Sequence, residues 1–277
     1  RLIDEHEVTG TVGSHRYRRV TGDFNLHTGE NAALRINAMA TRADNNGAGS
    51  SIDKRGLAAA YRWGIGTADE FSVGLYHLQY DNKPNYGIGW INGRPPEVDA
   101  GNYYGMASDY WRGKATFTTF AHTHRFQGGG ELKTQLRLGS FERDFWASTV
   151  RFATGTTAAN LSAATVLTRG NQGRQHTYDT RYVQTDYSGS FKAGGMKHEL
   201  LAGADIASES ISRYNYSGAP AKPATTVGTP NDGATLADTR TKTWATTFDA
   251  AAIGAYVQDT VQVSRDWKVI GGLRLDH

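Results

Sequence analysis

Hydrophobic and polar residues alternate along most of the chain, with the period of two that a β-strand gives to its two faces. In residues 17–27, for example, Val20 and Phe24 lie on one face while Asp23 and Asn25 lie on the other. The same alternation predicts about ten strands, at residues 17–27, 33–42, 56–65, 71–80, 114–126, 131–142, 176–191, 198–213, 248–263 and 267–276.

The connections between these strands differ in length in a regular way. Short turns are expected at residues 29–31, 66–70, 127–130, 192–197 and 264–266, and long segments at 43–54, 81–113, 143–175 and 214–247. Short turns on one rim and long loops on the other are typical of bacterial outer-membrane barrels. Strands of about ten residues also suffice to cross a bilayer at a tilt. The sequence therefore predicts an all-β fold, an antiparallel transmembrane β-barrel.

The two faces of the predicted strands favour a barrel with a polar interior. The charged residues that would face this interior are Arg35, Arg62, Arg137, Arg274, Asp23, Asp205 and Glu199. A small core filled by side chains would not accommodate so many charges, whereas a wide, wet lumen would. Aromatic residues near strand ends, as in an interfacial girdle, are Tyr61, Trp63, Phe71 and Trp267. A soluble β-sandwich with one solvated face is the alternative interpretation of the same pattern.

Composition narrows the class of protein. A net charge of +3, from 30 basic and 27 acidic residues, argues against a nucleic-acid-binding surface. The chain has no cysteine, which excludes disulfides and thiol chemistry within it. Its longest apolar stretch, residues 250–257, is far too short for a membrane helix. Because the chain opens at Arg1 without a signal segment and stops at His277 after a strand-like stretch, we expect a fragment of a longer protein.

Several segments resemble one known family. Residues 254–259 and 267–276 resemble a barrel hairpin of the TonB-dependent siderophore receptors, in which a YxQD strand end, a turn and a WkxxxGxRxD strand follow one another. Residues 198–205, HELLAGAD, are similar to another strand of that family. Residues 75–93 and 103–110 resemble a strand and loop of its catecholate-receptor branch. These segments occur in the order that the family has.

The resemblance implies both a fold and a function. It implies that residues 1–277 form a partial β-barrel domain, about ten strands of a barrel of about 22, with the plug domain and the remaining strands absent from the sequence. It implies TonB-dependent import of ferric siderophores, of catecholate type, by a monomeric receptor in the bacterial outer membrane that is not an enzyme. The implied partners are the ferric siderophore, TonB through the plug, and outer-membrane lipid, with no nucleic acid. No resident cofactor is implied, because the iron is carried within the siderophore.

The expected ligand suggests which residues bind it. A catecholate–iron complex is anionic and aromatic, so its receptor should offer aromatic faces and guanidinium donors. We expect the ligand contacts to be Tyr86, Trp90, Arg94, Tyr103, Tyr104, Trp111, Arg112, Arg143, Trp146 and Arg151. Tyr110, Phe145, Arg169 and Arg174 lie in the same two long segments and extend this set. The alternative for each residue is an interfacial anchor or a loop-packing contact.

His122 and His124 are two residues apart and would share one face of a strand, where they could hold a metal ion. The sequence shows no third ligand for such a site. We therefore expect these histidines to be polar lining of the barrel wall, with no metal site and no catalytic residue in the chain.

Two other functions are compatible with a barrel. One is a passive outer-membrane channel, which would need neither plug nor TonB. The other is a ten-stranded outer-membrane barrel protease, for which His176, Asp179 and Asp186 could be assembled into a group that activates water. Their spacing matches no physically justified pattern, and a protease leaves the family-like segments unexplained.

Overall fold

The structure, a computed structural model, describes residues 2–44 and 49–277 and consists of one antiparallel sheet. Its strands are β1 (Glu5–Val12), β2 (Arg18–Gly29), β3 (Ala32–Ala43), β4 (Ile52–Trp63), β5 (Asp69–Asn82), β6 (Tyr110–Arg125), β7 (Glu131–Phe152), β8 (Val166–Ala193), β9 (Met196–Ser217), β10 (Thr225–Thr226), β11 (Thr241–Gln262) and β12 (Lys268–Asp276). A 3-10 helix, Ala158–Asn160, lies between β7 and β8. Within the described ranges, no helix is long and apolar enough to cross a membrane. Residues 45–48 of the predicted loop 43–54 lie outside the described residues.

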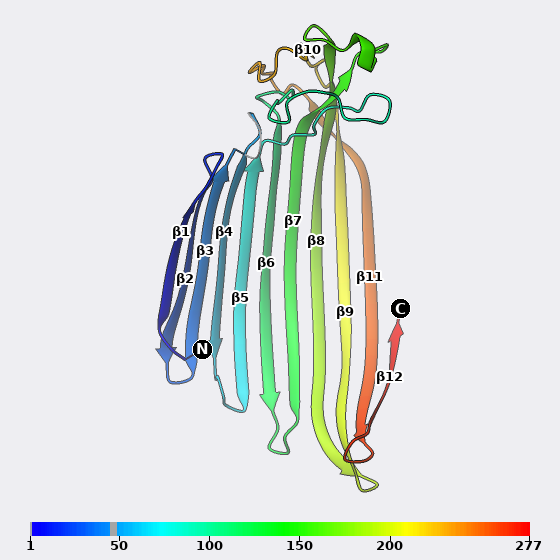
Figure 1. The fold of residues 1–277 in the computed structure, drawn as a ribbon. Coiled ribbons are helices and arrows are strands. Elements are labelled where there is room, and N and C mark those ends of the chain that lie inside the picture. The colour runs from blue at the N-terminus through cyan, green and yellow to red at the C-terminus, as the bar shows by residue number, and fades with distance from the viewer. Residues whose placement is uncertain (1, 45–48) are drawn as a thin grey trace.

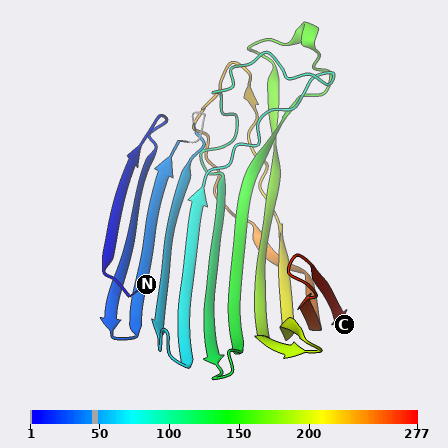
Figure 2. The same cartoon turned by 60° about the horizontal axis from the view of Figure 1, so that its bottom comes forward.

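Each long strand pairs with the long strands that flank it in sequence, in the order β1-β2-β3-β4-β5-β6-β7-β8-β9-β11-β12 (Figure 1). The two-residue β10 pairs with β8, which leaves β9 and β11 adjacent. The described sheet is open, with β1 and β12 at its edges. Figure 2 shows the short turns at one end of the sheet and the long loops gathered at the other. The predicted all-β antiparallel architecture is confirmed.

The strands depart from the prediction mainly at the loop end. All ten predicted strands are present, but β7, β8, β9 and β11 are longer, at 22, 28, 22 and 22 residues. The segment 143–175, predicted as a loop, is therefore largely strand, with residues 153–165 between β7 and β8. Alternation fails there because Phe145 and Trp146, on opposite faces of β7, are both buried. The pattern also missed β10 and the edge strand β1, whose residues are all exposed.

The sheet has an apolar face and a polar face, formed by alternate residues of its strands. The apolar face includes Leu75, Phe120 and Ile206, whose side chains are 41%, 46% and 56% exposed. Large apolar side chains that stay exposed over most of a sheet are expected where lipid covers them instead of water. This face agrees with the predicted outer wall of a barrel.

The polar face carries ion pairs between strands, both between neighbours and across an intervening strand. Nε of Arg35 donates to Oδ1 of Asp23 at 2.9 Å, and Nη2 of Arg274 lies 3.0 Å from Oδ1 of Asp205. These four residues are among the charges predicted for the barrel interior, and the structure places them on the face opposite the apolar one. The polar face is therefore the lumen side of the wall.

An aromatic cluster lies on the apolar face near the short turns. The rings of Tyr61 and Trp63 stack at 5.6 Å, those of Trp63 and Phe71 at 5.3 Å, and those of Phe71 and His122 at 4.4 Å. Three of these residues belong to the girdle predicted from the sequence. Trp267, the fourth, is 71% exposed at the turn before β12. Aromatic rings at this level are typical of a membrane–water interface.

The buried core of the described residues lies at the loop end of the sheet. Tyr104, Val150 and Leu167 form a buried cluster in which residues from a loop and from two strands meet. The loops that pack there and their partner strands position most of the aromatic and basic residues predicted to bind a ligand. We call these packed loops, residues 83–109, 153–165 and 218–240, the loop platform.

Candidate functional site

A buried ion pair joins two loops of the loop platform. Nζ of Lys222 lies 2.8 Å from Oδ1 of Asp109, and the two side chains are 1% and 2% exposed. Ser148 donates to Asp109 from its backbone N–H at 2.9 Å and from its hydroxyl at 3.0 Å. The backbone N–H of Met106 donates to the same carboxylate at 3.1 Å. A buried charge requires such a set of partners, and this set fixes the loops to β7.

Trp146 packs inside the loop platform between two cations. Nζ of Lys222 lies 4.9 Å from the ring centre, and the guanidinium carbon of Arg240 lies 4.3 Å from it. The ring nitrogen donates to Oδ1 of Asn171 at 2.8 Å. Trp146 is 2% exposed, so its cation–π contacts hold the loops and do not face solvent.

Arg169 connects β8 to the loop platform with a fully buried side chain. Its Nε donates to the carbonyl of Tyr104 at 2.7 Å, and its Nη2 donates to Asp232 at 2.7 Å. The carbonyl of Tyr103 accepts from the backbone N–H of Asn231 at 2.7 Å. Tyr103 and Tyr104 are each 3% exposed, so these two predicted ligand contacts also lie within the packed loops.

Burial shifts two ionisable groups in the loop platform. Burial raises the pKa of the Tyr103 hydroxyl, and the charge of Asp109 adds to this effect. Burial lowers the pKa of Lys222, while the hydrogen bond to Asp109 and the charge of that carboxylate oppose the change. Both shifts arise from packing, because these groups are buried inside the loops.

Below the loop platform, the polar face carries a row of basic side chains on three adjacent strands. Arg143 of β7 is paired in register with His176 of β8, and His176 is paired with Arg213 of β9. Arg174 lies two residues along β8 from His176, on the same face. We call Arg143, Arg174, His176 and Arg213 the cationic row.

Aromatic rings surround one end of the cationic row. The guanidinium carbon of Arg143 lies 4.3 Å from the ring centre of Trp111 and 4.8 Å from that of Phe145. Tyr86 stacks on Trp111 with ring centres 6.5 Å apart and an interplanar angle of 7°. The ring nitrogen of Trp111 donates to the hydroxyl of Tyr80 at 3.2 Å. Tyr86, Trp111 and Arg143, three of the predicted ligand contacts, are thus brought together.

The guanidinium groups of the cationic row have no salt-bridge partner among residues 2–44 and 49–277. Nε of Arg143 and Nε of Arg213 are buried and lack a hydrogen-bond acceptor. On the same face of the sheet, Arg35 is paired with Asp23. Buried donors are rarely left without an acceptor in proteins. The cationic row is therefore suited to an anionic ligand.

A pocket of about 360 Å³ opens beside the cationic row. Its lining combines apolar and aromatic side chains with Arg143, His176, Lys114 and Glu142. The other polar-face residues of the lining are Leu78, Tyr80, Ala115, Phe141 and Tyr178. Concave sites of this size, with apolar walls and a few charged groups, are common for small ligands.

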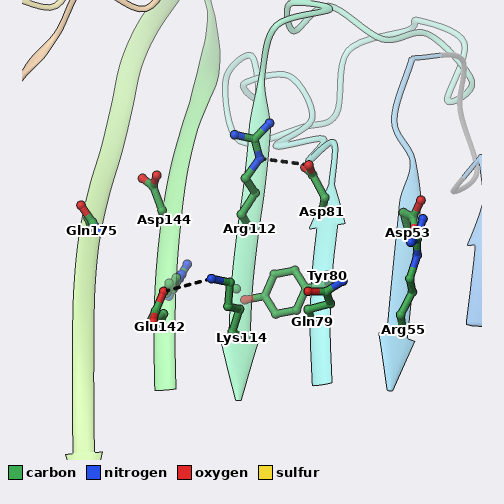
Figure 3. Close-up of a pocket in the computed structure, with 12 residues that line it drawn as sticks. Asp53, Arg55, Gln79, Tyr80, Asp81, Arg112, Lys114, Glu142, Asp144 and Gln175 are labelled. Atoms are coloured by element: carbon green, nitrogen blue, oxygen red, sulfur yellow. Dashed lines mark hydrogen bonds and ion pairs between the residues drawn. The ribbon is translucent and has the colours of Figure 1, made fainter. Parts of the chain in front are cut away.

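A groove of about 380 Å³ is lined mostly by residues of the opposite face, which Figure 3 draws. Arg112 and Asp81 point toward each other from β6 and β5, 3.0 Å apart. Lys114 and Glu142 form a second pair across β6 and β7, at 3.7 Å. Apart from Arg143, which also lines this groove, its cations already have carboxylate partners, so the groove is less suited to an anion.

The predicted ligand contacts therefore occupy four different places. Trp90 is 70% exposed and Tyr86 45% exposed, and Arg94 and Arg151 are also exposed on the loop side. Trp111 and Arg143 lie on the polar face. Arg112 lies on the apolar-face side, and the residues buried inside the loop platform are Tyr103, Tyr104 and Trp146.

Sequence reasoning missed Arg213 and Tyr80 as site residues and considered His176 only for a protease. The signal that could have found them is strand register, because Arg143, His176 and Arg213 stand side by side only when three strands are correctly aligned. Alternation places each residue on a face but does not align neighbouring strands.

One cluster of the described residues could hold a metal ion, and it lies away from the loops. Asp69, His122 and His124 bring one ligand atom each to within 4.8 Å of the others, at the short-turn end of the sheet. Asp69 is the third ligand that the sequence did not reveal. These histidines lie on the apolar face with Phe120, and not on the lumen side that was predicted for them.

Comparison with known families identifies the barrel. Residues 59–277 match the family described as TonB dependent receptor-like, beta-barrel. The chain is 23% identical over 293 residues to the catecholate siderophore receptor Fiu of Escherichia coli strain CFT073, covering 98% of this chain and 38% of that protein. The chain thus spans about two fifths of the length of the curated relatives it matches.

Solved structures show the same fold. The ferric-catecholate import receptor Fiu from Escherichia coli K12, in its open form, superimposes with a TM-score of 0.87 at 21% identity, covering all of this chain and 44% of that one. The siderophore receptor PiuA from Acinetobacter baumannii superimposes with a TM-score of 0.88 at 19% identity, covering 100% and 42%. At this identity the likeness establishes the fold alone.

Proposed function

Since the chain belongs to the TonB-dependent receptor β-barrel family, whose members lie in the bacterial outer membrane, we propose that it forms part of the wall and loops of an importer of ferric siderophores. The family consists of transport receptors and not of enzymes, so the protease alternative has no support. Relatives whose names specify catecholate or siderophore receptors support the import of a siderophore.

The observation that carries the proposal is the cationic row. Arg143, Arg174 and Arg213 present guanidinium groups without carboxylate partners among the described residues, and Trp111 and Tyr86 lie beside them. An iron–catecholate complex is anionic and has aromatic rings at its surface. Guanidinium groups bind such oxygen-rich anions, and aromatic side chains stack against the rings. The row therefore matches a catecholate better than a neutral chelate.

In this proposal the ligand enters from the loop side. Trp90 and Arg94, exposed in loop 83–109, meet the complex first, and the cationic row binds it inside the lumen. The chelator supplies every iron ligand, so the protein needs no resident cofactor. A monomeric receptor coupled to TonB through a plug domain completes the proposed mechanism.

A direct titration tests the proposed site in the complete protein, purified in detergent. The probe is the iron(III) complex of 2,3-dihydroxybenzoate, a simple catecholate. We expect Arg143→Ala and Arg213→Ala each to weaken its binding about tenfold or more, because truncating a central arginine of a binding site commonly costs about 2 kcal/mol. Arg112→Ala is the matched control, since Arg112 is paired with Asp81 on the opposite face.

Two outcomes test the proposed binding site and the proposed ligand class separately. Equal affinity in all three variants would exclude the cationic row as the binding site. If the protein binds a neutral iron(III) hydroxamate complex and not the catecholate, siderophore import stands and the catecholate assignment is wrong.

A further inference from the structure

Asp69, His122 and His124 converge on the apolar face beside the short turns. Oδ1 of Asp69 lies 2.8 Å from Nε2 of His122 and 2.8 Å from Nδ1 of His124. From this geometry we infer a binding site for a divalent transition-metal ion such as Zn²⁺, separate from the proposed siderophore site.

Regular strand geometry builds the site. His122 and His124 are alternate residues of β6 and so project from one face. Asp69, the first residue of β5, is paired in register with His124. The three ligands therefore stand on two hydrogen-bonded strands, and sites on such elements are held more accurately than sites on loops.

Aromatic neighbours orient both imidazole rings. Phe71 stacks on His122 with ring centres 4.4 Å apart and an interplanar angle of 12°. Phe126 meets His124 edge to face at 4.6 Å. Each ring is packed so that one nitrogen points at Asp69, which reduces the ordering that metal binding would require.

The carboxylate of Asp69 is not committed to a basic side chain. Its salt-bridge partners among the described residues are the two histidines. The nearby cations, Arg62 and Arg125, pair with Glu70, whose side chain projects to the other face of β5. A carboxylate with two imidazoles and no competing lysine or arginine is a donor set that first-row divalent metals prefer.

The site is accessible to an ion, and its side chains can rearrange to coordinate one. The three side chains are 36–48% exposed, which leaves an entry path for the ion. Zinc bonds of about 2.0–2.1 Å require the donors to move slightly apart, which side-chain rotation provides. In the neutral imidazole that binds a metal, the proton sits on the ring nitrogen that faces away from Asp69, so the facing nitrogen offers its lone pair to the ion, and water completes the coordination.

Zinc binding to the complete, metal-stripped protein in detergent tests the inference. We expect the wild-type protein to bind one more equivalent of Zn²⁺ than the double variant His122→Gln with His124→Gln, as measured by calorimetry and by metal analysis. Asp69→Asn should weaken zinc binding by about tenfold or more, because it removes the charged ligand. His198→Gln is the matched control: His198 lies 2.6 Å from Asp259 but has no second histidine beside it.

Equal zinc stoichiometry and affinity in wild type and the double variant would overturn the site. If the double variant does not assemble, the isosteric Asp69→Asn decides, and an unchanged affinity there overturns the inference. A loss of zinc in His198→Gln as large as in Asp69→Asn would likewise contradict it. Siderophore titration of the same variants separates this site from the cationic row, because they should bind the catecholate probe normally.

Discussion

The hydroxyl of Tyr104 donates to the carbonyl of Val227 at 2.9 Å, although 123 residues separate them in the chain. This bond joins the loop that follows β5 to the loop that follows β9. Together with the buried pair of Asp109 and Lys222, it makes the loop platform one packed unit. We therefore expect a substitution that destabilises the packing of one loop to destabilise the packing of the other.

Asp109→Asn should loosen both loops at once. The variant leaves Lys222 buried beside a neutral amide, and removing one partner of a buried ion pair commonly costs about 3–5 kcal/mol. Hydrogen exchange of residues 83–109 and 218–240 should accelerate together. Glu97→Gln, at an exposed position of the same loop, is the control. Faster exchange confined to residues 83–109 would contradict a single packed unit.

Acidification should open the loop platform only below about pH 4. The hydrogen bond from Arg240 lowers the pKa of Asp238. Burial alone would raise the pKa of Asp232, but the backbone N–H of Ala234 and the guanidinium of Arg169 outweigh it and lower that pKa. Since both carboxylates have a lower pKa when folded, their stabilisation is complete above the unfolded value of about 3.9 and is lost as the pH falls through the folded value.

Pepsin digestion across an acid pH series measures this opening. Cleavage within residues 218–240 should begin below about pH 4, after correction for the pH dependence of the protease on an unfolded substrate. Asp232→Asn should reduce the dependence on pH. Opening already between pH 7 and pH 5 would mean that a group other than these two carboxylates controls the loops.

Trp90→Ala combined with Arg94→Ala should weaken catecholate binding while leaving the barrel assembled. Trp90 is 70% exposed, so its removal leaves no cavity in the fold. Fluorescence titration with the iron–dihydroxybenzoate complex measures affinity, and migration of unheated samples in gel electrophoresis measures assembly. Unchanged affinity would remove both residues from the binding surface.

Gly64→Ala should impair folding more than Gly66→Ala. Both glycines have positive φ, at +67° and +80°, in the turn between β4 and β5. A Cβ at Gly64 would also overlap the carbonyl oxygen of Asp69, whereas Gly66 has open space around it. We expect about 1–3 kcal/mol from backbone strain in either variant, and more for Gly64→Ala. Urea titration of refolded protein compares them, and equal midpoints would contradict the steric argument.

The fold could be predicted from sequence because lipid and lumen impose a strict alternation on each strand. Val20 and Asp23, for example, are assigned to opposite faces by position alone. Prediction failed where that alternation ends. Phe145 and Trp146 are adjacent and both buried, since the cationic row's aromatic neighbours cover one face and the loop platform covers the other. A strand buried on both faces shows no period of two.

The candidate site was predicted in part for a related reason. Aromatic and basic residue types pointed to Trp111 and Arg143, which meet at 4.3 Å. The same residue types also pointed to Tyr103 and Trp146, which the structure places inside packed loops. Composition cannot separate a ring that packs from a ring that binds. Composition also gave no reason to place Asp69 beside His122. The two residues are 53 positions apart in the chain and meet only when β5 and β6 pair in the correct register.

The pairing of strands with their sequence neighbours has a consequence for the order of assembly. Each long strand pairs with a strand that is one connection away in the sequence. The loop that closes when two strands pair is therefore short, and closing it costs little conformational entropy. Contacts in the loop platform span up to 130 residues, as between Arg240 and Tyr110. They can form only after the intervening hairpins are in register. The wall, with the cationic row on its strands, should therefore appear early and the packed loop platform last, so that a kinetic trap late in folding would yield an intact wall whose loops are not yet packed.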